Sequence, residues 1–345
     1  MLPDKTHIKT IIIGAGPAGI SCGYTLLKNG SDCLIIDRKE FPREKICGGG
    51  LTPQAHAFVD RIFNGLNYDY MDIRAIKMFY RKKYICSYSI DKGLRIVSRR
   101  DFDYTLLKEY EEKGGQRLTD IITKIEEEDD KIYLSLLSGK KLSCDYLIGA
   151  DGANSIVRKY LQPDFKRGFL WLEKTVIENE KKDLQVYFDN RLKNGYLYKF
   201  PNPRGYVVGY GDRHTNTATF DKLLKEYDLM PDCKTKGAYI PMFDKQDYPF
   251  RKNILLAGDA GGYVDSITGE GLYFAFKSGE NAALSIIQGK DYKQLNQPLM
   301  DIVKRRKRMA RLFYFPPVHR LFIYLSGKPK WLERINRRVN RELSN

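Results

Sequence analysis

The stretch TIIIGAGPAG, residues 10–19, decides the fold class of this chain. A short β-branched run ends at Ile13, three glycines follow with G-x-G-x-x-G spacing, and an apolar periodic segment continues through Leu27. A second apolar run, residues 33–36, leads into Asp37. Strand, glycine turn, helix, strand and acid in this order are typical of a dinucleotide-binding βαβ unit. We therefore predict an α/β fold whose first unit binds a dinucleotide.

Each glycine of this turn has a distinct predicted role. Gly14 makes the tight turn, Gly16 lets a pyrophosphate approach the backbone, and Gly19 allows close packing of the helix on the strand. Asp37 can accept hydrogen bonds from the hydroxyls of an adenosine ribose. The motif alone is weak evidence, but its context favours a ligand site over a purely structural turn.

A longer glycine-rich stretch, GDAGGYVDSITGEGLYFAFKSG, occupies residues 258–279. Residues 253–257 before it read as an apolar strand, the loop carries Asp259, and a helix is expected to start near Gly271. Glycines let a ligand approach the backbone, and a helix N-terminus offers free N–H groups. The segment therefore fits an anionic or hydroxyl-rich ligand.

A third stretch, CDYLIGADGANSIVR, occupies residues 144–158. An apolar strand runs into Asp151 and Gly152, and Ser155 and Arg158 follow on an expected helix. Taken alone, it fits equally well an ordinary strand-to-helix turn with Asn154 or Ser155 as the cap.

Together and in their order along the chain, the three stretches resemble the motifs of the para-hydroxybenzoate hydroxylase superfamily of flavoproteins. Within that superfamily the chain most resembles the geranylgeranyl reductase family, on the segments KICGGGL (45–51), YLYKFP (196–201) and TGEG (268–271). The resemblance covers approximately residues 8 to 290. Tyr198 stands where a Trp is usual and Ser266 where a Pro is usual. These two departures leave open the shape of the substrate cavity and the rigidity of the flavin loop.

The resemblance implies a Rossmann-like FAD-binding domain of the glutathione-reductase type, with an inserted, mainly antiparallel β-sheet substrate domain and a helical C-terminal tail. We assign residues 1–73, 95–160 and 250–290 to the FAD-binding domain. Residues 74–94 and 161–249 form the substrate domain, because they carry β-branched and aromatic runs separated by turn residues. Residues 291–345 form a basic helical region, broken at Pro316-Pro317 and at residues 327–329.

The same resemblance implies which residues contact FAD. They are Gly14, Gly16, Pro17, Ala18, Gly19, Asp37, Arg38, Lys45, Cys47, Gly48, Arg99, Ile122, Asp151, Gly152, Gly258, Asp259, Gly269, Gly271 and Leu272.

Three of these assignments have a plain alternative. Arg99 fits the arginine that the family places at the start of a helix, but its neighbour Arg100 could make the contact instead. Ile122 fits a backbone contact to adenine or an ordinary core position. Cys47, followed by three glycines, can lie close to the isoalloxazine, whereas most free cysteines are small buried hydrophobes.

An aromatic cluster is expected to line the substrate site. Tyr196, Tyr198, Phe200 and Tyr206 fall on neighbouring strands and can line a cavity for a long apolar substrate, although such residues suit a sheet core equally well. We assign Cys47 and Tyr206 as candidate catalytic residues, with an ordered water as the other candidate proton donor.

The resemblance implies an FAD-dependent oxidoreductase that reduces isolated C=C bonds of a polyprenyl diphosphate or lipid. The alternatives are an FAD-dependent monooxygenase of an aromatic or polyketide-like substrate, and a flavin-binding sensor or assembly protein without turnover. The electron donor is NAD(P)H or a protein of the ferredoxin or flavodoxin type. The sequence does not decide between the two donors.

Composition limits the partners. The chain has 345 residues and a net charge of +16, and residues 301–345 alone hold thirteen Lys or Arg against three acids. Within this tail Trp331, Leu332, Ile335, Val339 and Leu343 recur at helical spacing, which is typical of an interfacial helix. An anionic membrane surface, an acidic electron-donor protein or the catalytic domain itself could cover that face. Nothing resembles a nucleic-acid module, and the oligomeric state is open.

The remaining features concern metal and location. The six cysteines and four histidines show no metal-ligand spacing, so we expect no metal site. No signal peptide or spanning segment is expected. The cysteine usage suits a reducing cytoplasm, with a peripheral position at the inner face of the cell membrane as an extension of the tail hypothesis.

Overall fold

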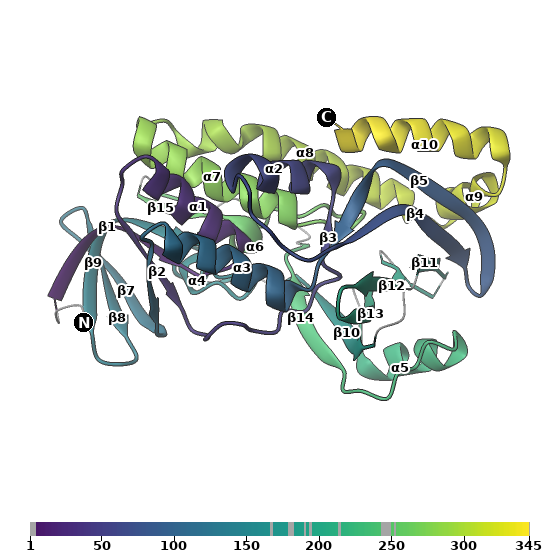
Figure 1. Cartoon of the computed structure of the whole chain (residues 1–345), viewed down its shortest axis with the longest axis horizontal. Helices are drawn as coiled ribbons and strands as arrows, with labels where there is room; N and C mark the ends of the chain where they lie inside the picture. The colour runs from purple at the N-terminus through teal and green to yellow at the C-terminus, as the bar shows by residue number, and fades with distance from the viewer. Residues whose placement is uncertain are drawn as a thin grey trace.

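Two β-sheets and a layer of helices make up the computed structural model (Figure 1). The structure describes residues 5–165, 168–178, 183–189, 191–192, 195–212, 215–242, 250–251 and 253–344. The first sheet contains β1 (Lys5–Ile13), β2 (Cys33–Asp37), β6 (Gln116–Thr119), β7 (Ile122–Glu128), β8 (Lys131–Leu136), β9 (Lys141–Gly149) and β15 (Ile254–Leu256).

The central strands of this sheet are buried on both faces. The order is β6-β2-β1-β9-β8-β7, with β15 also paired to β9. Strands β6, β2, β1, β9 and β15 are parallel, and β7, β8 and β9 form an antiparallel meander. In β1, Ile12 packs toward one side, whereas Ile11 and Ile13 pack toward the other. Continuous β-branched runs are typical of parallel strands covered on both faces.

Helices cover one face, and short elements cover the other. The first face is covered by α1 (Pro17–Lys28), α2 (Pro53–Ile62), α3 (Arg99–Glu112) and α7 (Leu272–Gln288). On the opposite face, side chains of β7, β8, α4 (Ile156–Leu161) and α6 (Gly258–Gly261) share one core with those of β1 and β2. Ser155 caps α4 through a hydrogen bond from the Arg158 N–H at 2.9 Å, as the sequence predicts.

The second sheet is mainly antiparallel. Its strand order is β14-β10-β13-β12-β11-β4-β5-β3, and only the pair β11 and β4 is parallel among the pairs in the described residues. The strands are β3 (Gly50–Leu51), β4 (Met71–Tyr80), β5 (Lys83–Ile96), β10 (Phe169–Ile177), β11 (Leu184–Phe188), β12 (Leu197–Asn202), β13 (Gly205–Gly211) and β14 (Lys236–Ile240). The helix α5 (Thr217–Glu226) packs on one face of this sheet.

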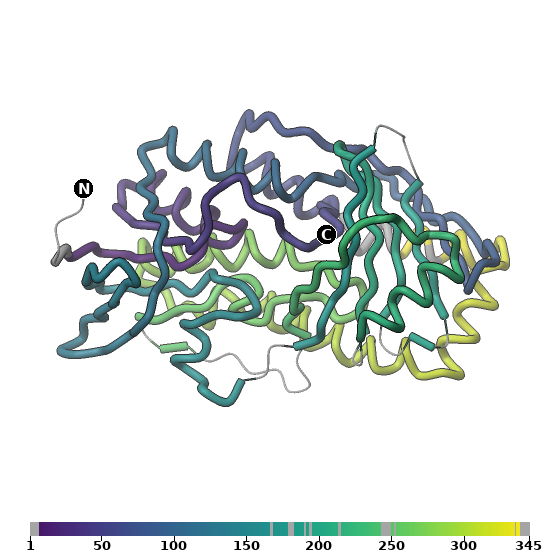
Figure 2. The backbone as a smooth tube through the Cα atoms, turned by 90° about the horizontal axis from the view of Figure 1, so that it is seen from below, coloured from purple at the N-terminus to yellow at the C-terminus, as the bar shows by residue number. Residues whose placement is uncertain are grey.

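Three C-terminal helices run along both sheets (Figures 1 and 2). They are α8 (Tyr292–Phe313), α9 (Pro316–Ser326) and α10 (Pro329–Ser344), and the proline breaks lie where the sequence predicts them. Buried Leu299 and Val303 of α8 pack against Phe274 of α7, while Ile323 of α9 packs against Met78 of β4.

The apolar stripe of α10 faces the protein at its start. Leu332 packs with the cluster around Met78, and the Trp331 ring lies 5.6 Å from that of Phe322. Packing of this stripe on the catalytic domain is one of the three alternatives that the sequence leaves open. The side chains of Ile335, Val339 and Leu343 lie outside the described ones.

Sequence and structure agree on the α/β class and on the helical C-terminus. The strands differ from the predicted ones mainly at their ends, since β1 begins at Lys5 and β5 continues to Ile96. The sequence pattern did not indicate β6, β7 and β8. The proposed division into domains stays a prediction. No helix among the described residues is long and apolar enough to cross a membrane.

Candidate functional site

The three glycine-containing stretches meet at one edge of the parallel sheet. Strands β1, β2, β9 and β15 all end there, at Ile13, Asp37, Gly149 and Leu256. Carboxyl ends of parallel strands are where α/β sheets bind their ligands. Segments that are far apart in the sequence therefore face one common space.

Gly14 makes the close turn that the sequence predicts. Its φ is 105°, and a Cβ there would lie 2.4 Å from the carbonyl oxygen of Ala150. The Gly14 N–H donates to the Ile36 carbonyl at 2.7 Å, and the Ala15 N–H donates to the Asp37 carboxylate at 2.7 Å. The first stretch is thus fixed to the loops after β2 and β9.

Gly16 faces open space. A Cβ at this position would meet no protein atom closer than Arg43 Nη2, at 3.6 Å, and one at Gly152 would meet nothing within 4 Å. Gly16 is also the N-cap of α1 and makes no side-chain capping bond, so the first N–H groups of α1 remain available to a ligand. This is the cradle that a pyrophosphate needs.

Asp151 carries a buried oxygen without a partner in the described structure. Its Oδ2 accepts a hydrogen bond from the Ile156 N–H at 2.7 Å, while Oδ1 finds no hydrogen-bond partner among the described residues. Burial raises the pKa of this carboxyl to about 6. An unpartnered buried oxygen on the cavity wall suits a ligand that donates a hydrogen bond.

The glycine-rich stretch of residues 258–279 forms the opposite wall. Asp259 lies in α6, and Gly271 caps α7 without a side-chain hydrogen bond. The loop between these helices is held in place, because Arg306 of α8 pairs with Asp265 at 3.3 Å and the Tyr196 hydroxyl donates to the Thr268 carbonyl. The α7 N–H groups are therefore presented to the cavity from a braced loop.

All three stretches line one cavity of about 1430 Å³. Of the predicted FAD contacts, the following line it: Gly14, Gly16, Pro17, Ala18, Asp37, Arg38, Lys45, Cys47, Gly48, Arg99, Ile122, Asp151, Gly152, Gly258, Asp259, Gly269, Gly271 and Leu272. Gly19 does not, because a Cβ there would lie 1.9 Å from the Gly14 carbonyl oxygen. Its role is the close helix–strand packing that the motif implies.

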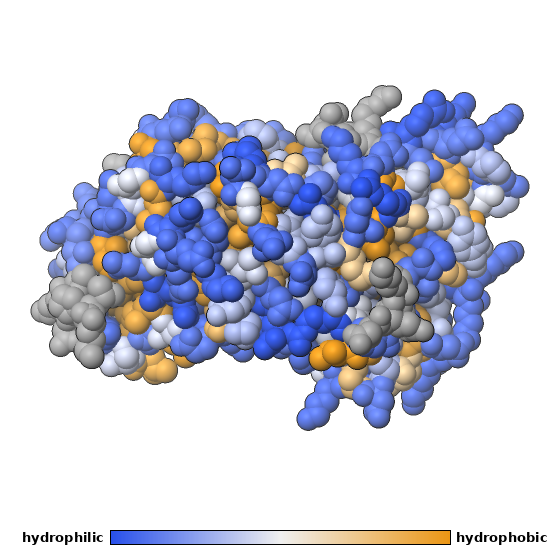
Figure 3. All heavy atoms as spheres, in the orientation of Figure 1, coloured by the Kyte–Doolittle hydropathy of each residue, from blue (hydrophilic) through white to orange (hydrophobic). Residues whose placement is uncertain are grey.

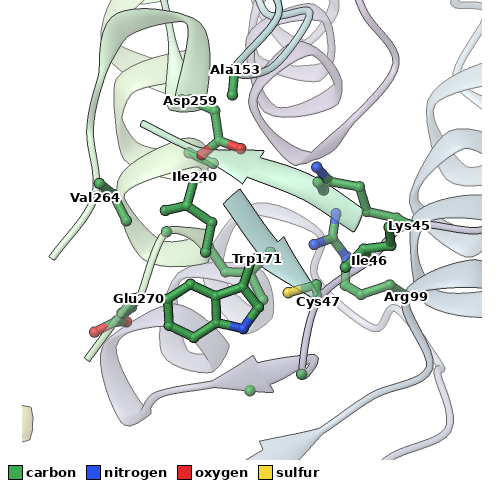
Figure 4. Close-up of a pocket in the computed structure, with 18 of the residues that line it drawn as sticks. Lys45, Ile46, Cys47, Arg99, Ala153, Trp171, Ile240, Asp259, Val264 and Glu270 are labelled. Carbon is green, nitrogen blue, oxygen red and sulfur yellow. The ribbon is translucent and has the colours of Figure 1, made fainter. Parts of the chain in front are cut away.

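Cys47 and Arg99 lie together on one side of this cavity (Figure 4). Arg99 is buried, and its guanidinium forms hydrogen bonds of 2.8 and 2.9 Å to Asp103. The Asp103 carboxylate and the Cys47 thiol both interact with this guanidinium and favour its charged form, against the opposing effect of burial. Arg100, the alternative, instead pairs with Glu44 and Asp101 on the surface.

The aromatic cluster is split between two faces of the second sheet. Tyr196 directly before β12, and Tyr198 and Phe200 within it, all line the cavity. The ring centroids of Tyr196 and Tyr198 are 6.1 Å apart, and those of Tyr198 and Phe200 are 4.7 Å apart. Tyr206 lies on the opposite face, where Lys199 covers its ring. The prediction that Tyr206 lines the substrate cavity and acts in catalysis is therefore wrong, because its place in the register of β13 turns it away.

The sequence did not indicate two acids near this wall, the buried Glu173 and the half-buried Glu270. Glu173 of β10 accepts a hydrogen bond from the Tyr198 hydroxyl at 2.7 Å, and Glu270 accepts one from Thr52 at 2.5 Å. Burial raises the pKa of each carboxyl to about 7. A lone acid inside the apolar run FLWLEKTVI was the signal that could have indicated Glu173.

Beyond the glycine loops the cavity continues as an apolar chamber. Its walls come from β4, β5, β11 and the C-terminal helices, and include Ile76, Met78, Ile90, Val186, Phe188, Phe313, Phe322 and Trp331. Trp171 lies in the cavity wall, with Cys47 and Arg99 on one side of it and Val264 and Glu270 on the other (Figure 4). The sequence did not indicate that the C-terminal helices would contribute to this chamber.

The residues present fit FAD. The Gly16 cradle suits a pyrophosphate, Asp37 and Asp259 suit ribose or ribityl hydroxyls, and the unpartnered Asp151 oxygen suits a further donor. Among the residues that the structure describes, no group of three His, Cys, Asp or Glu could hold a metal ion.

Comparison with known proteins gives one family match. The family described as FAD binding domain matches residues 7–58 and 96–226. An uncharacterized protein of Methanosarcina barkeri is 32% identical over 79% of this chain and 73% of its own length. The geranylgeranyl diphosphate reductase of Rhodobacter capsulatus is 27% identical over 79% of this chain and 73% of its own length.

Solved structures share the fold. A geranylgeranyl bacteriochlorophyll reductase-like protein of Thermoplasma acidophilum superposes with a TM-score of 0.77, at 17% identity, over 96% of both chains. A probable FAD-dependent monooxygenase of Pseudomonas aeruginosa superposes with a TM-score of 0.73, at 15% identity, over 93% of this chain and 99% of its own. The fold is therefore common to reductase-like proteins and monooxygenases.

Proposed function

The chain belongs to the FAD binding domain family, with geranylgeranyl diphosphate reductases among its relatives, and from this premise we propose that it reduces isolated C=C bonds of a polyprenyl chain. The chain would be carried on a diphosphate or a lipid. The observation that carries the proposal is the apolar chamber that continues from the flavin cradle. A long hydrocarbon needs such a chamber, because burial of each CH₂ group contributes about 0.8 kcal/mol.

We expect the cofactor to lie in the cradle. Gly16 and the N-terminus of α1 would hold the pyrophosphate, Asp37 the adenosine ribose, and the N–H groups at Gly271 and Leu272 an edge of the ring system. When bound and reduced, FAD supplies a hydride to the alkene.

The chain's own residues prepare the alkene for that hydride. Trp171, Tyr198 and Phe200 form an apolar wall that positions the hydrocarbon and excludes water. An isolated alkene is a poor hydride acceptor, so a proton must be delivered to the second carbon from a fixed group. The Cys47 thiol lines the cavity next to Arg99, and is one group that can affect this step.

A single-turnover experiment tests the proposal. The FAD-loaded protein is reduced without oxygen and mixed with geranylgeranyl diphosphate or a polyprenyl lipid. We expect flavin reoxidation that depends on the isoprenoid, and a product heavier by two hydrogens per reduced bond in mass spectrometry. Reoxidation only with oxygen, with an aromatic substrate hydroxylated, would instead establish the monooxygenase. A flavin that neither substrate class reoxidises would support the sensor.

The electron donor can be identified in the same preparation. Anaerobic bleaching of the flavin by NADH or NADPH, or only by a reduced ferredoxin or flavodoxin, distinguishes the two donor classes.

We propose that the α8–α9 corner holds the protein at an anionic membrane surface. Leu312, Phe315, Leu321 and Tyr324 are 63, 55, 55 and 63% exposed. Exposed cations flank them, including Arg308, Arg311, Arg320 and Lys328. Elsewhere, on the face shown in Figure 3, apolar residues form small patches among hydrophilic ones. Basic residues near an anionic surface contribute about 1 kcal/mol each.

Vesicle sedimentation tests this surface. We expect binding to phosphatidylglycerol vesicles, no binding to phosphatidylcholine vesicles, and weakening by salt. Leu321→Glu should reduce binding, whereas Ile177→Glu, at a position 73% exposed on β10, should not. Equal binding by both variants, or indifference to anionic lipid, would overturn the assignment and favour an acidic donor protein as the partner of the tail.

A further inference from the structure

A buried tyrosine–glutamate pair lies in the cavity wall beside Cys47. Glu173 and Tyr198 are each 3% exposed, and Tyr198 lines the cavity. The Tyr198 hydroxyl donates to Glu173 Oε2 at 2.7 Å. The family pattern has a Trp at position 198, so the pair belongs to this chain rather than to the resemblance.

The strand register brings these two side chains together. Glu173 of β10 and Tyr198 of β12 both pair with Gly209 of β13, from opposite sides. A Cβ at Gly209 would lie 2.1 Å from the Tyr198 hydroxyl oxygen. The missing side chain lets the Tyr198 ring lie flat across β13 and reach the carboxylate two strands away.

Other groups fix the two ends of the pair. The Cys47 backbone amide, which lies near Glu173, favours the charged form of that carboxyl and opposes the effect of burial on its pKa, and the Trp171 indole lowers the pKa of Tyr198 against the same effect. The charged groups that face Glu173 are Arg99 from α3 and Lys236 from β14. Both cations favour the carboxylate form, while burial opposes it.

We propose that Tyr198 is the proton donor of the alkene reduction and that Glu173 acts through it as the proton reservoir. This inference rests on the proposed function. When Glu173 is protonated, its O–H donates to the Tyr198 oxygen, and the phenolic O–H is free to face the chamber. As one alkene carbon accepts the hydride with its electron pair, the other takes that phenolic proton. The Glu173 O–H then transfers its proton to the tyrosinate oxygen, leaving a carboxylate that Tyr198 donates to. A proton from solvent restores the acid.

The geometry accounts for both roles. Tyr198 touches the chamber, whereas Glu173 lies behind it and does not line the cavity. A carboxyl group with a pKa of about 7 can exist as the acid near neutral pH. General-acid catalysis by a positioned group contributes about 10²- to 10⁴-fold to a rate.

The chain supplies a matched control pair on the other face of the same sheet. The Tyr227 hydroxyl donates to Asp189 at 2.8 Å, and neither residue lines the cavity. Burial raises the pKa of Asp189, but the hydrogen bond from Arg191 to this carboxylate contributes to a net lowering of that pKa. A second buried tyrosine–carboxylate pair thus exists that does not hold a proton near neutral pH.

The first measurement is single-turnover alkene reduction by pre-reduced holoenzyme at saturating isoprenoid. We expect Tyr198→Phe to be about 100-fold slower, with unchanged FAD and isoprenoid affinity. The wild-type rate should fall as pH rises through about 7, where Glu173 loses its proton, and Glu173→Gln should lose that dependence. Tyr227→Phe should behave as wild type.

The second measurement needs neither flavin nor turnover. Infrared difference spectra of the flavin-free protein should contain a carboxyl C=O band that disappears near pH 7 and is missing in Glu173→Gln. Glu270 titrates in the same range, so the band is assigned by its loss in this variant. Tyr198→Phe should move its midpoint upward, because the lost hydrogen bond stabilised the carboxylate. Asp189→Asn should leave the band unchanged.

The outcomes separate the two ideas. If wild type reduces isoprenoids and Tyr198→Phe does so at the same rate, the proton-donor assignment is overturned and the proposed function stands. If Glu173→Gln retains the wild-type pH profile and band, the reservoir role is overturned. If wild type reduces no isoprenoid while the band titrates as expected, the proposed function fails and the pair has another use for its proton.

Discussion

Gly14 and Gly16 have different predicted roles: Gly14 makes the tight turn, and Gly16 leaves room for the ligand. Replacing each by alanine therefore tests the effect on stability and the effect on FAD binding separately. At Gly14 the new Cβ would overlap the Ala150 carbonyl at 2.4 Å in a backbone with φ 105°. Strain of about 1–3 kcal/mol and overpacking of about 1–3 kcal/mol together predict a loss of about 2–6 kcal/mol in unfolding free energy. Against a typical stability of about 5–15 kcal/mol, this is severe.

At Gly16 the same change should spare the fold. The backbone there is extended, with φ −84° and ψ −177°, and the nearest protein atom to the new Cβ is 3.6 Å away. The loss of a favourable N-cap costs about 1 kcal/mol. The methyl group would occupy the pyrophosphate's approach and weaken charged hydrogen bonds worth about 1.5–3 kcal/mol each. The Kd for FAD should therefore rise at least tenfold.

Urea unfolding of the flavin-free proteins and quenching of FAD fluorescence measure the two quantities. Gly30→Ala is the control, because Gly30 has φ 68° but no atom within 4 Å of its Cβ position. Gly30→Ala therefore measures the cost of backbone strain without the steric clash that Gly14→Ala adds. Gly16→Ala with wild-type FAD affinity would refute the cradle, and Gly14→Ala with wild-type stability would refute the turn.

Three further changes test the cavity wall. Cys47→Ala should keep FAD and lower or redirect isoprenoid turnover, measured by product analysis; lower unfolding free energy with unchanged turnover would show instead a thiol that only fills space. Gly209→Ala should displace the Tyr198 ring from β13 and slow alkene reduction about as much as Tyr198→Phe does. A Gly209→Ala rate equal to the wild-type rate would show that the reaction does not need the ring to lie flat on β13. The raised pKa of Glu173 means that its folded carboxyl holds the proton more tightly than the unfolded one. Wild-type stability is therefore lost as pH rises from about 4.5 to about 7, by about 3 kcal/mol. Glu173→Gln should accordingly be more stable than wild type at pH 8 but not at pH 4.5, and urea unfolding at the two pH values decides this.

The sequence predicted the glycine loops that line the cavity because their signals are local. The turn after β1 needs Gly14 at positive φ and Gly16 without a side chain, and both requirements are visible in six consecutive residues. The choice between Arg99 and Arg100 was not local. It depends on which side of the first turn of α3 faces the cavity, and the Asp103 carboxylate one turn later holds Arg99 there.

The chamber depends on strand register and long-range packing, so the sequence predicted less of it. Tyr206 and Phe200 look alike as aromatic strand residues, but Phe200 pairs with Val207, and Tyr206 pairs with Pro201 on the other face. The partnership of Glu173 with Tyr198 depends on three strands in register. The contribution of Phe322 to the chamber depends on how α9 packs against β4 and β5.

One segment connects the two sides of the site. The Cys47 segment leaves the flavin cradle and enters β3, where Gly50 pairs with Ile96 of β5 in the second sheet. The chain then enters α2, which packs with α7 on the first sheet. Because the Cys47 N–H also contacts Glu173 and its thiol contacts Arg99, a shift of this short segment moves groups on the flavin side and the substrate side together. The position of Cys47, and not only its thiol chemistry, therefore couples the geometry of the cradle to that of the chamber. Cys47→Ser, which keeps that position, should preserve more turnover than a substitution at Gly49, whose backbone has φ 73° and whose Cβ would lie 2.1 Å from the Val97 carbonyl oxygen.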